Sequence, residues 1–171
     1  FYEYVAAAFT FGRETFERVF GVTAGAFEEF WNNAVQHDWG AQHPGIIDAQ
    51  DLAFVIPVQH HSDGAAMLNK IEYNIYSVSS VTAKGNSYDT KLVVTLLETH
   101  LYIDGVTDRE ITRFINWSAE QLQLGKWPAV GFLGETFDPD HYRGLNAGQP
   151  LAGSYRRGSE HQPTKFRICV W

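Results

Sequence analysis

The sequence predicts an α+β fold, a single domain over residues 1–171 in which N-terminal helices pack on a largely antiparallel β-sheet. Aromatic residues recur at helical spacing in the first 36 residues, as they do in helices with one buried face. Two later segments alternate apolar and polar residues, which is typical of half-buried strands. Helices followed by strands favour this arrangement over alternating βαβ units. No linker, low-complexity segment or long-period repeat divides the chain.

Two aromatic stripes predict the N-terminal helices. Each stripe has apolar side chains at positions i, i+3 and i+4, which share one face of a helix. The residues are Phe16, Val19 and Phe20 in the first stripe and Phe27, Phe30 and Trp31 in the second. Gly21 is suited to end the first helix, and Thr23 to cap the second. We expect both stripes to face the core; an aromatic-lined pocket or a surface for a partner helix is the alternative.

The middle of the chain predicts a short strand followed by a hairpin. Residues 51–59 form an apolar run that we expect to be a buried strand closed by Pro57, with a loop at 60–64. Apolar and polar residues alternate over 71–76, and 91–103 return as a long strand after a segment rich in turn residues. The two strands are expected to pair in antiparallel fashion.

Residues 106–117 are compatible with two structures. Asp104-Gly105 is a two-residue hairpin signal, which would make the segment a third strand. Residues 107–110 also match a capping box, and apolar residues at helical spacing follow them. We favour a helix from about Asp108 to Leu124. Behind it, a short strand is expected at 129–133, and alternation over 164–171 predicts a closing strand.

Composition excludes several classes of partner. Lys and Arg number 13 against 20 Asp and Glu, a formal net charge of −7, and binding to a phosphate backbone needs clustered cations, so nucleic acid is not expected. No apolar run approaches the roughly 20 residues that span a membrane. The single cysteine, Cys169, excludes an intrachain disulfide and a multi-thiolate metal site. The chain begins with Phe1 rather than Met, which favours a processed, extracellular protein but leaves the compartment open.

The predicted strand at 91–103 carries the best candidate for chemistry. Strict alternation places the polar residues at its end on the face of the apolar residues at its start. In order, this face carries Leu92, Val94, Leu96, Glu98, His100 and Tyr102. Glu98 could orient His100 and leave its second ring nitrogen free for proton transfer, with Tyr102 as a donor or anchor. These three are the predicted catalytic residues; the alternative is a strand end that emerges into solvent.

The polar segment 134–150 is the second candidate. Its function-capable side chains, the predicted substrate-binding residues, are Asp138, Asp140, His141, Tyr142 and Arg143. Two aspartates could also ligate a hard cation such as Ca²⁺, but the remainder of an EF-hand loop is absent. A plain surface loop, opened by an Asp-Pro turn, is the alternative.

Histidines and acids also occur together elsewhere. The groups are His37 and His43 around Asp38, and His60-His61 before Asp63. Two imidazoles and a carboxylate can bind zinc, iron or copper, yet neither pair has the His-x-x-x-His spacing that places both rings on one helix face. Exposed loop histidines are therefore expected, with no metal and no cofactor.

Two functions fit these observations. The aromatic content of 15% and the Glu98-His100-Tyr102 row favour a pocket that binds a small molecule or glycan, with hydrolase or lyase chemistry by acid–base catalysis if the protein is an enzyme. The alternative is a non-enzymatic subunit of a coat, tube or filament, or a protein-binding factor, because low charge and abundant aromatics also suit interfaces. A homo-oligomer is compatible with either function.

Overall fold

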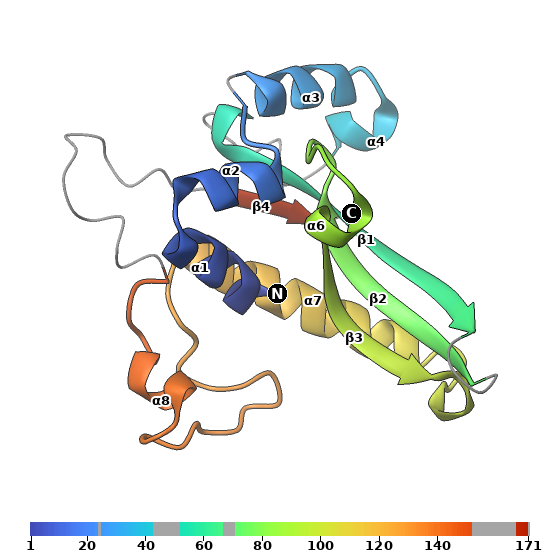
Figure 1. The fold of residues 1–171 in the computed structure, drawn as a ribbon, viewed down its shortest axis with the longest axis vertical. Helices are drawn as coiled ribbons and strands as arrows, with labels where there is room; N and C mark the ends of the chain where they lie inside the picture. The colour runs from blue at the N-terminus through green and yellow to red at the C-terminus, as the bar shows by residue number, and fades with distance from the viewer. Residues whose placement is uncertain (24, 43–51, 67–70, 152–166, 171) are drawn as a thin grey trace.

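The computed structural model describes residues 1–171 except 24, 43–51, 67–70, 152–166 and 171 (Figure 1). The helices of this part are α1 (Tyr2–Phe11), α2 (Arg13–Phe20), α3 (Ala26–Ala34), α4 (Asp38–Ala41), α6 (Ser87–Thr90), α7 (Thr107–Leu124) and α8 (Tyr142–Asn146). Short 3-10 helices are η1 (Leu52–Phe54) and η3 (Thr99–Leu101). The strands are β1 (Val55–Ala66), β2 (Glu72–Ser80), β3 (Lys91–Glu98) and β4 (Arg167–Val170).

The strands form one sheet in the order β3-β2-β1-β4. β1, β2 and β3 pair in antiparallel fashion, and β4 lies parallel to β1 with Ile168 beside Ile56. In Figure 1 the N-terminal helices lie near the end of the sheet where β1 begins, and α7 runs along the strands. One hydrophobic core joins side chains of α1, α2, α3, α7, β1 and β2. The predicted α+β class, with its N-terminal helices and largely antiparallel sheet, is confirmed.

Both aromatic stripes face the core, as predicted. Phe16 and Phe20 of α2 and Phe27 of α3 are almost fully buried, and Trp31 is completely inaccessible to solvent. The indole Nε1–H of Trp31 donates a 2.7 Å hydrogen bond to the carbonyl oxygen of Val55, at the start of β1. A buried indole needs such an acceptor, so this bond fixes α3 against the sheet.

Gly21 ends α2 in the left-handed conformation, with φ +67°, as the sequence predicts. A Cβ at this position would lie 2.2 Å from the carbonyl oxygen of Thr82, so close packing also requires glycine. The expected side-chain cap by Thr23 is absent: α3 begins at Ala26, whose N–H is accepted by the Thr23 carbonyl. Gly25 lies between them and turns the chain with positive φ.

β1 is longer than predicted. It passes through Pro57, and the predicted loop at 60–64 lies inside it, because β2 supplies a partner at every position from Val58 to Ala66. Pro57 lacks an N–H, but its carbonyl accepts a 2.9 Å hydrogen bond from the N–H of Val81. Cross-strand pairing therefore overrides the turn-like composition of this segment.

β3 is shorter than the strand predicted at 91–103, because it ends at Glu98 and a 3-10 turn follows. Its register against β2 shifts at Val94, which stands as an extra residue between two paired positions. Such a bulge interrupts the alternation of faces. Leu96 and Glu98 consequently lie on the opposite face from Leu92, and the predicted row on one face is wrong.

The segment 106–117 is helical, as favoured, and Gly125 ends α7 with φ +65°. The predicted capping box does not form. The hydroxyl of Thr107 instead accepts the N–H of Ile103 at 2.8 Å, and Glu110 pairs with an arginine one turn further on. The hydroxyl therefore orders the turn that precedes the helix instead of capping its N–H groups.

The C-terminal part agrees with the prediction only partly. Residues 129–133 form no strand and contribute only an isolated bridge between Val130 and Thr136. The closing strand is present as β4, but it lies parallel to its neighbour. A parallel partner must enter the sheet by a crossover connection, which alternation alone does not reveal.

Replacing Trp31 with Ala should destabilise the protein by about 3–5 kcal/mol, because truncation leaves a cavity and an unpaired Val55 carbonyl. Urea unfolding of the variant and the wild type measures the loss. Tyr88→Ala is the control: Tyr88 is 96% exposed, so its removal should change stability by no more than about 0.5 kcal/mol. A loss below about 1 kcal/mol for Trp31→Ala would contradict the structural role assigned to its indole.

Candidate functional site

The predicted catalytic residues are brought together only in part. The Nδ1 of His100 lies 3.0 Å from Oε2 of Glu98, so the expected contact exists. The His100 side chain is nevertheless 67% exposed and lies in the 3-10 turn after β3. Tyr102 turns away and donates its hydroxyl to Asp108 of α7. The pair therefore lies on an open surface, and its catalytic role stays a prediction.

Asp108 is the centre of a hydrogen-bond network that sequence reasoning missed. Its Oδ1 accepts the hydroxyl of Tyr76 at 2.7 Å, and its Oδ2 accepts the hydroxyl of Tyr102. The hydrogen bonds from Tyr102 and Tyr76 lower the pKa of Asp108. Burial, followed by the bond to Asp108, raises the pKa of Tyr76. The network ties β2 and the turn before α7 to the first turn of that helix.

The adjacent histidines were expected in an exposed loop, but both lie in β1. The ring of His60 stacks on Tyr76 at 6.0 Å between centroids and 11° between planes. Burial, and then His61, lowers the pKa of His60. The Nε2 atoms of both histidines are buried without a hydrogen-bond partner in the described part of the chain. Neighbouring strand residues point to opposite faces, so the two rings cannot share one ligand. His43 of the other predicted group lies outside the described residues.

Three of the five predicted substrate-binding side chains, those of Asp138, His141 and Tyr142, order or anchor their own loop. Asp138 accepts the N–H of Asp140 at 2.9 Å, and the Nδ1 of His141 accepts the N–H of Arg143 at the start of α8. The ring of Tyr142 packs edge-on against Trp127, with 5.2 Å between centroids. These contacts agree with the surface-loop alternative, and the binding role of these residues stays a prediction.

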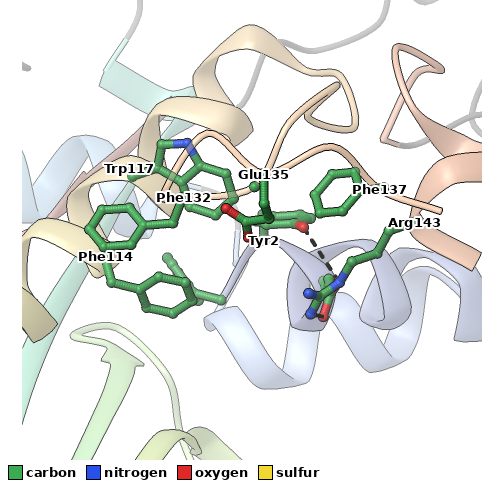
Figure 2. A pocket seen from close by; sticks show the side chains of 10 residues that line it. Tyr2, Phe114, Trp117, Phe132, Glu135, Phe137 and Arg143 are labelled. Carbon is green, nitrogen blue, oxygen red and sulfur yellow. Dashed lines mark hydrogen bonds and ion pairs between the residues drawn. The ribbon is translucent and has the colours of Figure 1, made fainter.

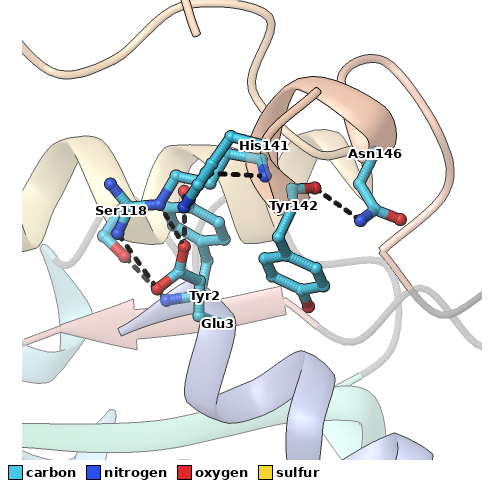
Figure 3. A network of polar contacts seen from close by, with 7 residues as sticks. Tyr2, Glu3, Ser118, His141, Tyr142 and Asn146 are labelled. Carbon is cyan, nitrogen blue, oxygen red and sulfur yellow. Dashed lines mark hydrogen bonds and ion pairs between the residues drawn. The ribbon is translucent and has the colours of Figure 1, made fainter. Parts of the chain in front are cut away.

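Arg143 differs from its neighbours because it reaches α1. Its Nε and Nη2 contact the two carboxylate oxygens of Glu3 at 2.6 and 3.2 Å, a bidentate pair between residues 140 positions apart (Figure 3). The hydrogen bond from Arg143 to Glu3 raises the pKa of the guanidinium. In the same region, the N–H of Tyr2 donates a 2.8 Å hydrogen bond to the hydroxyl of buried Ser118. Together these contacts join α1, α7 and the α8 segment.

Arg143 lies at one side of a pocket between α1, α7, α8 and the segment before α8 (Figure 2), and Glu3 also lines this pocket. We call it the aromatic pocket; its lining residues are Phe1, Tyr2, Glu3, Phe114, Trp117, Gly131, Phe132, Glu135, Phe137 and Arg143. It encloses about 80 Å³. The rings of Phe114 and Trp117 lie 5.5 and 5.9 Å from that of Phe132, with edge-to-face geometry. Such mutual packing holds the apolar wall rigid.

The polar groups of the pocket are held in place by its backbone. The Oε2 of Glu135 accepts the N–H of Leu133 at 2.9 Å, and its carboxylate lies over Gly131. A Cβ on Gly131 would lie 1.8 Å from Oε1 of Glu135, so a larger residue there would displace this carboxylate from its position. Burial, followed by the charge of Glu3, raises the pKa of Tyr2 to about 12, and the phenol is neutral at physiological pH. Burial lowers the pKa of the Phe1 α-amino group to about 6, so this group is mainly neutral at physiological pH, and two carboxylates and one guanidinium leave the pocket with one net negative charge.

Of all the residues singled out from the sequence as site candidates, only Arg143 lines this pocket. Glu3 and the aromatic wall were missed, and Glu135 lies in the candidate segment 134–150 but was not among its predicted binding residues. The signals present in the sequence are the aromatic residues of α7 at i and i+3, Phe114 and Trp117, and the run from Phe132 to Phe137 that contains Glu135. Neither signal indicates that α1 closes the pocket.

No protein family model, curated protein or solved structure matches this chain. Among the residues that the structure describes, no three His, Cys, Asp or Glu side chains are grouped so as to hold a metal ion. Within the same residues, every helix is too short or too polar to cross a membrane. A functional assignment therefore depends on the chemistry of the pocket and the surfaces themselves.

Tyr76→Phe removes the buried hydroxyl that donates a hydrogen bond to Asp108. We expect the free energy of unfolding to fall by about 1–3 kcal/mol at neutral pH, as for other hydrogen bonds to charged groups. The pKa of Asp108 is lowered by folding, so the stabilisation is present above about pH 4 and is lost as pH falls through the folded-state pKa. In urea unfolding at decreasing pH, the difference in free energy of unfolding between variant and wild type should become smaller. Tyr88→Phe, at an exposed site, is the matched control. A difference in free energy of unfolding that does not change on acidification would contradict the role of Asp108.

Proposed function

We propose that the aromatic pocket binds a small, neutral, polyhydroxylated ligand, such as one ring of a glycan. The observation that carries the proposal is the combination of an aromatic wall with two carboxylates and a guanidinium in one recess. Binding sites for small ligands are mainly apolar, with a few polar groups that fix the orientation. An apolar ring face would pack on Phe132 and Trp117, and hydroxyl groups would bond at the polar side.

The charges of the pocket favour hydroxyl groups over anions. Carboxylates only accept hydrogen bonds, so Glu3 and Glu135 suit ligand hydroxyls as donors. The guanidinium of Arg143 is already bound to both oxygens of Glu3. An anionic ligand would have to displace Glu3 or enter a recess with a net negative charge, and either change costs electrostatic energy. A neutral ligand avoids both costs.

The size of the recess limits the ligand. Its volume of about 80 Å³ is well below the roughly 300–1,000 Å³ of pockets that enclose drug-sized molecules. A single ring inserted by one edge fits this space better than an extended chain bound along its length. We therefore infer recognition of a terminal ring or a free monosaccharide, with the remainder of a larger ligand in solvent.

Acid–base catalysis is a second candidate function, favoured by the 3.0 Å contact between Nδ1 of His100 and Glu98. The carboxylate can fix the tautomer of the ring and leave Nε2 to exchange a proton with a substrate. The open position of the pair allows access to a large substrate. It provides no enclosure, which would strengthen electrostatic interactions during a reaction.

The first test is binding of a panel of neutral monosaccharides, measured by calorimetry and by tryptophan fluorescence, since Trp117 lines the pocket. We expect saturable binding that Glu135→Gln weakens by about 10-fold or more, because a hydrogen bond to a charged acceptor is lost. Gln can still accept the Leu133 N–H, so the loop should keep its shape.

Glu120→Gln is the control, since it makes the same chemical change on an exposed part of α7 outside the pocket. It should leave the affinity unchanged. Absence of saturable binding by every sugar, or equal affinities for wild type and Glu135→Gln, would contradict the proposal.

The second candidate is tested with chromogenic glycosides and esters and the variant His100→Gln. Gln cannot take up a proton near neutral pH, so a catalytic His100 predicts a loss of about 100-fold or more in rate. The melting temperature should stay unchanged because the side chain is largely exposed. His37→Gln, another exposed histidine, is the control. Equal rates for His100→Gln and wild type would exclude His100 from catalysis.

A further inference from the structure

β3 lies at one edge of the sheet, and its outer side has no strand neighbour among the described residues (Figure 1). Its sequence, KLVVTLLE, carries large apolar side chains that remain open to solvent: Val93 is 45% exposed and Leu96 is 44% exposed. An edge strand of eight residues with unpaired backbone groups is a template for pairing with another chain. Natural proteins often protect such an edge with charged residues and bulges, and β3 has Lys91 and a bulge at Val94, yet its apolar side chains remain exposed.

The bulge in β3 arranges its charged and apolar residues symmetrically. Directly paired residues share a face, and the partners on β2 assign four β3 residues to the face away from the main core. These pairs are Ser79 with Lys91, Ser77 with Val93, Ile75 with Leu96 and Tyr73 with Glu98. Leu92 and Leu97 lie on the other face, opposite Val78 and Asn74. The first three residues from Lys91 and the last three residues back from Glu98 therefore alternate between the two faces in the same order.

We propose that β3 pairs in antiparallel fashion with β3 of a second copy of this chain, about a twofold axis perpendicular to the sheet. In that arrangement Lys91 of each copy lies opposite Glu98 of the other, and Val93 lies opposite Leu96. Leu92 meets Leu97 on the core side. Every pair joins residues of the same face, and the two four-stranded sheets become one.

Charge complementarity selects this occupant and this register. The strand begins with its one cation and ends with its one anion, so an antiparallel copy matches both, whereas a parallel copy would oppose like charges. A slip of one residue would set side chains of one face against those of the other. Because an interface is isologous about a twofold axis, each favourable pair occurs twice.

The contact is small, since it consists mainly of one eight-residue strand from each copy. Stable dimers usually bury at least about 1,200 Å² in total, so we expect a reversible dimer whose population rises with concentration. The interface is separate from the aromatic pocket, because β3 contributes no residue to the lining of that pocket.

Sedimentation equilibrium of the full chain over a range of concentrations tests the proposal. The wild type should pass from monomer to dimer. Lys91→Glu sets two acids opposite each other at both ends of the contact, and Glu98→Lys sets two cations there, so each variant should remain monomeric. Combining both changes in one chain restores opposite charges and should restore the dimer.

A mixture of the two single variants distinguishes charge repulsion from misfolding. Each variant is repelled by its own copies. In a mixed pair, however, the acid introduced by Lys91→Glu faces the cation introduced by Glu98→Lys, and the unchanged Glu98 of the first chain faces the unchanged Lys91 of the second. The mixture should therefore form a one-to-one dimer, an outcome that misfolding of either variant could not produce. Lys126→Glu and Glu120→Lys, equal charge changes at exposed sites away from β3, should dimerise as the wild type does.

A wild type that stays monomeric at its highest soluble concentration overturns the proposal, even if it binds a different protein through this edge. Dimerisation of Lys91→Glu alone with unchanged strength, or failure of the mixture to associate, also overturns it. Salt should weaken the wild-type dimer, because the end pairs are exposed.

Discussion

The packing of Tyr2, the first residue of α1, against α7 and Trp127 is the contact on which the pocket side of the molecule depends. Its N–H donates to the buried hydroxyl of Ser118, and its ring lies edge-on to both Trp117 and Trp127 at 5.6 Å. Both groups are buried, so a shift of α1 relative to α7 that breaks this bond would leave a buried donor and acceptor unsatisfied. The position of Glu3, and with it the pair to Arg143, follows from that geometry.

Local patterns in the sequence were sufficient for α2, α3 and α7, but they did not predict the short helices α4, α6 and α8. The aromatic stripes of α2 and α3, the stop at Gly21 and the extent of α7 follow from spacing within a few residues, which the sequence displays directly. Strand limits were less accessible, because they depend on partners: β2 extends β1 beyond Pro57, and one extra residue at Val94 changes the faces of β3. Neither effect can be recognised from the composition of the strand itself.

The pocket was harder to foresee than the fold, since its two sides are far apart in sequence. Glu135 and Arg143 of the polar segment 134–150 line the pocket, whereas Asp138 and His141 accept hydrogen bonds within the segment itself. Arg143 is held at the pocket by its ion pair with Glu3 of α1, a contact that the segment's own sequence does not indicate. Its side chain is 45% exposed, so the ion pair adds orientation more than stability.

The separation of 140 residues between Glu3 and Arg143 also bears on the order of events during folding. Closing so long a stretch of chain carries a large entropic cost before any contact offsets it. The hairpin of β2 and β3 and the helix α7 involve only nearby residues and can form early. The recess between α1 and α8 is thus expected among the last parts to assemble, and partial opening of the native protein would abolish it while the β1-β2-β3 part of the sheet persists.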